Sequence, residues 1–145
     1  MNKKDKLILV VSSPGGHLSV AKELLFNSDF KVQFVVQAKK NIVKENGFIY
    51  VSDSDRDLRI FIQLFQALRI ILDLKPAAIV STGAGVAIPF FLLAKILNIR
   101  AIFIESASRT KSLSLSGNIA YRLVDRFYVR NSSLAKAYPK AISFE

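Results

Sequence analysis

The alternation of short, apolar, β-rich runs with longer helical runs is the feature that most constrains this fold. The runs expected to form strands are Leu7–Val11, Val32–Val36, Phe48–Val51, Ala77–Val80, Ala101–Ile104, Arg126–Val129 and Ala141–Phe144. Helices are predicted over Leu18–Phe26, Asp57–Leu74, Val86–Leu97, Ser112–Leu123 and Ser132–Tyr138. Such alternation pairs strands in parallel through right-handed crossovers, and continuous apolar strands fit a sheet covered on both faces. We therefore expect a single Rossmann-like, doubly wound α/β domain over residues 1–145.

Composition limits the chemistry that the chain can perform. It has no cysteine and one histidine, which excludes thiolate chemistry and argues against a metal site. With 21 basic and 11 acidic residues, the net charge is +10, which favours anionic partners. The basic residues are scattered and form no RNA-binding motif, so we expect no nucleic-acid partner. An anionic membrane surface suits a chain that is both apolar and basic.

Two apolar stretches raise the question of a membrane span. Leu7–Val11 is five residues long, shorter than the roughly 7–15 residues of a signal-peptide core. The stretch from Ala77 to Ile104 is interrupted by Gly83, Gly85 and Pro89, so it offers no run of about 20 apolar residues. We therefore expect a strand, a helix and a second strand there, and peripheral attachment to the cytoplasmic face of a membrane.

Three loops have unusual sequences and follow predicted strands, where ligands of such sheets bind. The first, "SSPGGH", spans Ser12–His17. Its glycines allow a sharp turn, and the free N–H groups of the next helix make a site suited to phosphate. His17 stands where a Walker A motif has lysine, so ATP or NAD binding is disfavoured and no cofactor is expected. The imidazole of His17 suits a general base near neutral pH, although a tight turn that simply starts a helix explains the pattern equally well.

The second and third loops repeat this combination of glycine, hydroxyl and charge. In "STGAGVAIP", Gly83 and Gly85 open a helix, which again favours an anion, although any fold of this kind needs such a connection.

In "IESASRTKSLSLSG", Glu105 ends an apolar strand, where a carboxylate is costly unless something uses it. Hydroxyls with Arg109 and Lys111 suit a sugar phosphate. The alternative is a solvated loop that caps the next helix.

Taken together, "SSPGGH", "STGAGVAIPF", "IESASR…SLSG" and "DRFYV" occur in an order that resembles the acceptor-binding subunits of two-component glycosyltransferases. Bacterial members of that family assist capsule and exopolysaccharide synthesis. The eukaryotic member anchors the UDP-GlcNAc transferase that adds the second sugar of the dolichol-linked oligosaccharide. The order is more distantly similar to the amino-terminal half of the GlcNAc transferase that completes the peptidoglycan lipid precursor, an enzyme with the GT-B fold of two Rossmann-like halves.

The resemblance implies a division of labour. This chain would bind a polyprenyl-diphosphate-linked sugar, a separate subunit would bind the UDP-sugar donor, and the transfer would invert the anomeric carbon without a metal. The diphosphate would be cradled by the residues Ser13, Gly15 and Gly16. The same cleft would be lined by Thr82, Gly83 and Gly85, and the acceptor or the partner would be met by Glu105, Ser106 and Arg109. His17 is the preferred proton acceptor and Glu105 the second candidate.

Other interpretations of the sequence stay open. The chain could be a non-catalytic module that recruits a glycosyltransferase to the membrane and stimulates it, or a nucleotide-binding regulator of the same fold. The helical stretch Ile60–Leu74, with Arg59, Arg69 and Lys75, could lie in a membrane interface or pack on the sheet. Val86–Leu97 competes for the membrane role through the apolar residues Phe90, Phe91 and Leu92.

Overall fold

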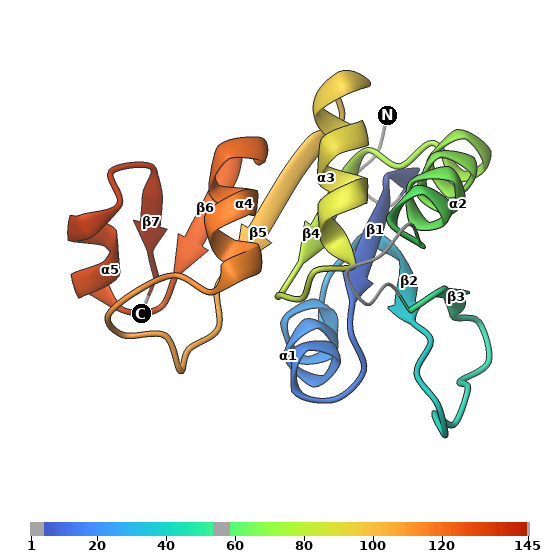
Figure 1. The fold of residues 1–145 in the computed structure, drawn as a ribbon, viewed down its shortest axis with the longest axis horizontal. Coiled ribbons are helices and arrows are strands. Elements are labelled where there is room, and N and C mark those ends of the chain that lie inside the picture. The colour runs from blue at the N-terminus through green and yellow to red at the C-terminus, as the bar shows by residue number, and fades with distance from the viewer. Residues whose placement is uncertain (1–4, 54–58, 145) are drawn as a thin grey trace.

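Seven strands form one parallel sheet in the computed structural model, which describes residues 5–53 and 59–144 (Figure 1). The strands are β1 (Leu7–Ser12), β2 (Lys31–Gln37), β3 (Ile49–Val51), β4 (Ala78–Ser81), β5 (Arg100–Ile104), β6 (Arg126–Val129) and β7 (Ala141–Ser143). The helices are α1 (Gly16–Leu25), α2 (Arg59–Leu74), α3 (Ala87–Ile96), α4 (Leu115–Leu123) and α5 (Ser132–Ala137). The strand order is β3-β2-β1-β4-β5-β6-β7, so the expectation of a Rossmann-like parallel sheet is confirmed.

The helix before β6 begins later than its sequence predicted. We expected it to start at Ser112, whereas α4 starts at Leu115. The reason is that Ser114 is extended and acts as the N-cap, with its side chain accepting a hydrogen bond from the Gly117 N–H. The predicted start of the preceding long helix, at Asp57, lies outside the described residues.

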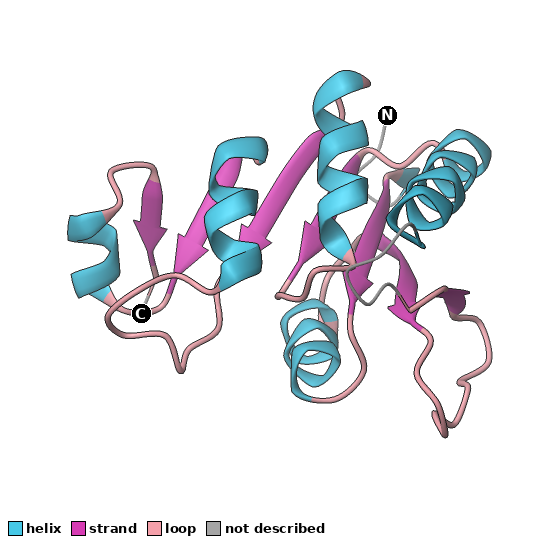
Figure 2. Cartoon of the chain, in the orientation of Figure 1, coloured by secondary structure: helices cyan, strands magenta, loops and turns pink. Residues whose placement is uncertain are grey.

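The helices are distributed unevenly over the two faces (Figures 1 and 2). The crossover from β1 to β2 runs in one direction along the sheet, and the four crossovers that carry α2 to α5 run in the other. Because crossovers are right-handed, opposite directions place helices on opposite faces. Accordingly, the α1 residue Ala21 packs with Ile8 and Val10 of β1, whereas α2 to α5 share a cluster with Leu9 and Val11. Among the described helices, α1 is alone on its face.

The main core lies between the sheet and α2 to α5. Within it, Phe91 meets Phe103 edge to face, with ring centroids 6.1 Å apart, and Phe103 stacks on Phe127 at 5.1 Å. Phe90 and Phe91 are 1% and 0% exposed, so the expectation that they could meet a membrane is wrong. Each such ring contributes about 1.5–3 kcal/mol of burial. The α3 residue Leu92 of the same segment is 40% exposed.

A bilayer span would need a long, uniformly apolar helix. Within residues 5–53 and 59–144, no helix meets that requirement.

Candidate functional site

The sheet order brings the three unusual loops to one edge. β1, β4 and β5 are neighbours and parallel, so the loops that follow them leave the same, carboxyl edge of the sheet. This is the edge at which Rossmann-like sheets bind ligands. The prediction that these loops share an edge is therefore confirmed.

The first two loops are joined by a reciprocal pair of hydrogen bonds. Nδ1 of His17 lies 2.9 Å from the carbonyl oxygen of Thr82, and the Thr82 hydroxyl donates to the carbonyl oxygen of His17 at 2.6 Å. Both side chains are thus oriented by a backbone segment 65 positions away. The pair fixes the spacing between the start of α1 and the loop that leads to α3.

The Thr82 contact also determines the tautomer of His17. A carbonyl oxygen only accepts, so Nδ1 of His17 must carry the proton in this hydrogen bond. In the neutral ring, Nε2 is then left with a lone pair. The side chain is partly exposed, so this nitrogen is the atom of His17 suited to accept a proton from a ligand.

Two glycines in these loops are required by the backbone or by the close approach of the histidine. Gly83 has φ 134°, and a Cβ there would lie 2.5 Å from Cε1 and Nδ1 of His17. Gly15 has φ 91° and ψ −141°, a region that is essentially restricted to glycine. A Cβ added at Gly16 or Gly85 would meet no atom within 4 Å, and both have an ordinary φ. Of these four glycines in the first two loops, only Gly15 and Gly83 are therefore needed for conformation or space.

The helix starts at this edge differ in how their N–H groups are satisfied. The first-turn amides of α1 and α3 receive no side-chain cap. By contrast, Ser114 caps α4. An uncapped helix start carries free N–H donors and a partial positive charge. In α3, the Ala87 and Ile88 N–H groups already donate to the carbonyl oxygens of Ala84 and Gly85, and Pro89 has no N–H. Among the described helix starts at this edge, the start of α1, which carries His17, is therefore the one suited to an anion.

Glu105 is buried and bonded within its own loop. It is 4% exposed, and its carboxylate accepts hydrogen bonds from Ser106 N–H at 2.9 Å, Ser114 N–H at 2.9 Å and the Ser114 hydroxyl at 3.0 Å. These bonds close the loop of residues 106–113 into a ring. A proton acceptor must be reachable, so this geometry argues against Glu105 in that role, and the assignment of the base to His17 stays a prediction.

Sequence reasoning missed the partners of Glu105. Ser114 and Gly117 lie within the quoted loop "IESASRTKSLSLSG", but neither was predicted to contact Glu105. A Cβ on Gly117 would lie near Oε2 of Glu105, so the glycine makes room for the carboxylate. The N-cap signal of a serine three residues before a helical glycine was present in "SLSG", but its pairing with Glu105 depends on tertiary structure.

The remaining predicted residues lie along the same loops. Ser13 is buried, and its carbonyl oxygen accepts from the Ser12 hydroxyl. The Ser106 hydroxyl lies 2.9 Å from that of Ser108. Arg109 is exposed and forms no ion pair with any described residue. Its guanidinium is therefore available to an anion that approaches the loop.

A metal site was not expected from the sequence. In the part of the chain that the structure describes, no group of three or more His, Cys, Asp or Glu residues is placed to hold a metal ion.

The sheet order, together with glycine-bearing loops at its carboxyl edge, defines a Rossmann-like domain equivalent to the amino-terminal half of a GT-B enzyme. The fold is similar to MurG from Acinetobacter baumannii (TM-score 0.66, 18% identity), with 86% of this chain and 41% of that chain covered. It is also similar to the UDP-GlcNAc 2-epimerase of Methanocaldococcus jannaschii (TM-score 0.74, 11% identity), over 94% of this chain and 45% of that one. These likenesses establish the fold.

The chain belongs to the family described as oligosaccharide biosynthesis protein Alg14 like, which matches residues 54–144. Relatives named UDP-N-acetylglucosamine transferase subunit ALG14 include that of Candida albicans, 28% identical over 97% of this chain and 64% of the relative. That of Mus musculus is 31% identical over 57% of this chain. The matched region spans 41% of the mouse protein, which is less than half its length. The resemblance to glycosyltransferase subunits is thus confirmed, and the capsule or exopolysaccharide branch stays a prediction.

Proposed function

We propose that this chain is the acceptor-binding subunit of a heteromeric inverting glycosyltransferase in polysaccharide biosynthesis, which holds a polyprenyl-diphosphate-linked sugar at the cytoplasmic face of the membrane. A partner chain would bind the UDP-sugar. Two findings support the division: the relatives are named as subunits of a UDP-GlcNAc transferase, and the chain covers 41% of MurG, about one Rossmann-like unit.

The observation that carries the proposal is the His17–Thr82 pair at the uncapped start of α1. A diphosphate at this start would receive N–H donors from α1, and Gly15 would let its oxygens approach the backbone. Arg109 would add a cation from the third loop. The site thus combines phosphate recognition with a base on the adjacent turn.

In the reaction, Nε2 of His17 would accept the proton of the attacking acceptor hydroxyl. The acceptor oxygen would form a bond to the anomeric carbon of the donor as the bond from that carbon to the UDP oxygen breaks, and UDP would leave with the electron pair. Attack from the opposite face inverts the anomeric carbon in one step. The Thr82 carbonyl stabilises the imidazolium that forms, because it holds the Nδ1 proton.

α2 supports contact with a membrane surface. Phe61, Phe65 and Leu72 are 66%, 68% and 55% exposed, and their spacing of four and seven residues places them along one side of the helix. Another side packs on the core through Ala67 and Ile71. Arg69 lies on the same helix, where it forms an exposed ion pair with Asp73 at 3.8 Å. An amphipathic helix with exposed aromatic rings binds at the headgroup level of a bilayer.

The test is a transfer assay with UDP-GlcNAc and a polyprenyl-diphosphate-linked GlcNAc, using this chain alone, a donor-binding partner alone, and both together. Transfer that requires both chains supports the proposal, and robust transfer by this chain alone contradicts it. Substituting Arg109 by alanine should raise KM for the acceptor more than KM for UDP-GlcNAc.

A non-catalytic module that recruits and stimulates the partner is the alternative. It is favoured by the Glu105 geometry, since the loop that this buried carboxylate shapes could form a docking surface for the partner. It predicts that His17→Ala weakens assembly but leaves turnover of the assembled complex unchanged. A nucleotide-binding regulator would instead bind UDP as the isolated chain, which calorimetry measures directly.

A further inference from the structure

The loop of residues 38–48, between β2 and β3, has an apolar tip surrounded by cations. Val43 is 86% exposed, the highest value among the described large apolar side chains. Lys39, Lys40 and Lys44 of the same loop are also exposed. Because β2 is parallel to β1, the loop leaves the carboxyl edge of the sheet, and Figure 1 shows it projecting from that edge. The tip therefore stands at the same edge as the candidate site.

Two turns give this loop a defined shape. In the first, the Ile42 N–H donates to the Lys39 carbonyl oxygen at 3.3 Å. Asn41 lies between them with φ 67°, a conformation that asparagine adopts more readily than most residues. The second turn closes residues 45–48. Val43 lies between the two turns, so the backbone of the loop itself holds this side chain outward.

The base of the loop is tied to three elements of the fold. Glu45 forms an ion pair with Lys22 of α1 at 2.7 Å, and its N–H donates to the Tyr50 hydroxyl of β3 at 2.7 Å. The side chain of Gln33 in β2 donates to the Gly47 carbonyl oxygen at 2.7 Å. Glu45 is the one acidic residue of the loop, so its carboxylate is already paired at the base.

The three lysines of the loop keep their charge for a ligand. None of them forms an ion pair with a described residue. The Lys44 ammonium lies 5.6 Å from the centroid of the Tyr50 ring, which orients it beside the tip. A single exposed valine is ordinary in a soluble protein. An apolar tip among unpaired cations is instead suited to an anionic bilayer, where phosphates meet the cations and the acyl boundary takes up the apolar groups.

We propose that residues 38–44 form a membrane-insertion loop. Ile42 and Val43 enter the boundary between headgroups and acyl chains of an anionic bilayer, and the three lysines contact lipid phosphates. This inference rests on the membrane location in the proposed function and deepens it, since it adds an element separate from α2 and determines which edge of the sheet faces lipid. A lipid-linked diphosphate at the headgroup level would then meet the start of α1.

The position of α2 agrees with this orientation. α2 follows β3, so it begins at the carboxyl edge, and its exposed rings Phe61 and Phe65 lie in its first half. They therefore lie toward the edge from which the loop projects. A protein partner fits the tip less well, because a stable interface buries about 800 Å² on each side and the tip offers two apolar residues.

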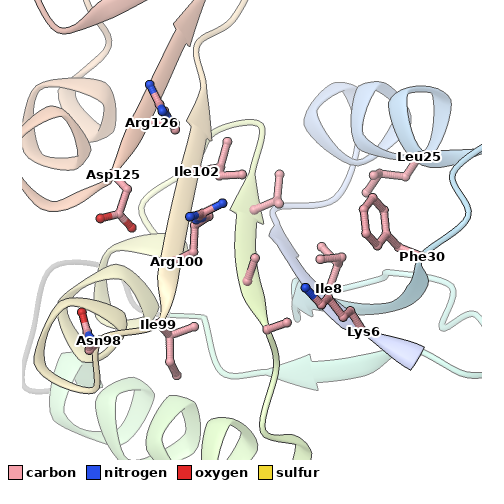
Figure 3. Close-up of a pocket in the computed structure, with 13 residues that line it drawn as sticks. Lys6, Ile8, Leu25, Phe30, Asn98, Ile99, Arg100, Ile102, Asp125 and Arg126 are labelled. Carbon is pink, nitrogen blue, oxygen red and sulfur yellow. The ribbon is translucent and has the colours of Figure 1, made fainter. Parts of the chain in front are cut away.

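The opposite edge of the sheet would face away from the bilayer. A groove of about 930 Å³ on the face beside α1 reaches that edge, where Arg100 and Arg126 begin β5 and β6 (Figure 3). Ile96 is 70% exposed at the end of α3, near the same edge. A fluorescent probe at position 43 should therefore enter lipid, whereas a probe at position 96 should stay in water.

The first test uses tryptophan fluorescence, because the chain contains no tryptophan. Val43→Trp and Ile96→Trp each introduce a single fluorophore, and the second variant is the matched control. Each full-length variant is mixed with vesicles of equal parts phosphatidylcholine and phosphatidylglycerol, with or without bromine on the acyl chains. Bromine quenches a tryptophan that it contacts. Circular dichroism checks the fold of both variants.

The second test reverses the charge of the loop. Lys39→Glu with Lys40→Glu is compared with Lys136→Glu with Lys140→Glu, the same change at exposed positions on and after α5. Co-sedimentation measures binding to the anionic vesicles and to vesicles of phosphatidylcholine alone, at low and high salt.

We expect brominated lipid to reduce the fluorescence of Val43→Trp by at least about twofold and to leave Ile96→Trp nearly unchanged. The loop pair should weaken binding to anionic vesicles by at least about tenfold, and the control pair by less than about threefold, with a difference that shrinks as salt rises. Binding to phosphatidylcholine alone should be weaker.

Four results would overturn the proposal: no binding to anionic vesicles, no quenching at position 43 in chains that bind, stronger quenching at position 96, or equal losses in the two charge variants. Quenching at the wrong position would mean that the basic groove edge, rather than the loop, meets the lipid. These measurements contain no sugar. A loop that inserts in a chain that supports no transfer would remove only the proposed function, and transfer in detergent without insertion would remove only the loop.

Discussion

Nδ1 of His17 donates to the carbonyl oxygen of Thr82 at 2.9 Å, and the Thr82 hydroxyl returns a hydrogen bond to the carbonyl oxygen of His17 at 2.6 Å. This reciprocal pair joins the turn after β1 to the turn after β4, and it leaves Nε2 as the nitrogen of the neutral His17 ring that carries a lone pair.

Replacing His17 by alanine removes the proposed base. In the assembled complex we expect kcat to fall by about 10²–10⁴-fold, because general-base catalysis contributes that much. The affinity for the partner should stay the same, which sedimentation or calorimetry measures. The recruiting alternative predicts the reverse: weaker assembly with unchanged turnover.

Gly83→Ala tests the close approach of the imidazole. The new methyl group would lie 2.5 Å from the ring at a φ of 134°, so the ring or the loop must move. We expect the free energy of unfolding to fall by about 1–3 kcal/mol and acceptor binding to weaken. Gly85→Ala is the matched control, since no atom lies within 4 Å of its added methyl group. Equal urea midpoints for the two variants would contradict the observed packing.

Ser114→Ala removes both the N-cap of α4 and a hydroxyl that supports Glu105, since this hydroxyl donates to the carboxylate at 3.0 Å and accepts from Gly117 at 2.9 Å. Loss of the N-cap should lower the free energy of unfolding by about 0.5–2 kcal/mol. The buried Glu105 carboxylate would also lose one hydrogen-bond donor, which adds to the loss. Urea unfolding measures the change. The control is Ser112→Ala, at an exposed position in the same loop, which should change the free energy of unfolding by less than about 0.5 kcal/mol. If Ser112→Ala lowered it as much as Ser114→Ala, the stability of the loop would depend on its composition rather than on the hydrogen bonds to Glu105.

Substituting Phe61 and Phe65 by serine tests the membrane-facing side of α2. Each ring that enters a bilayer interface contributes on the order of 1 kcal/mol or more, so binding to vesicles with anionic lipid should weaken by at least about tenfold. Co-sedimentation with vesicles measures this. Leu115→Ser is the control, because Leu115 is 72% exposed on a different helix, α4. An equal loss in the control would remove α2 as the membrane contact.

Local patterns predicted most of the fold. All seven strands and five helices were expected from apolar runs and turn residues, and their observed ends differ mostly by one or two positions. The glycine loops after β1 and β4 were recognised because glycine, proline and a strand end are signals within a few residues. Phe90 and Phe91 were misjudged as possible membrane contacts, because an apolar helix has the same sequence pattern whether it is buried by a sheet or by lipid.

The sequence by itself determined the alternation of strands and helices, the basic charge and the family motifs, since each is carried by neighbouring residues or by composition. Only the tertiary structure decided that His17 and Thr82 orient each other, that Glu105 is enclosed by Ser114 and Gly117, and that the sheet face beside α1 stays open. The physical reason is that these relationships join residues far apart in the chain. They depend on strand order and crossover direction, which no local pattern encodes.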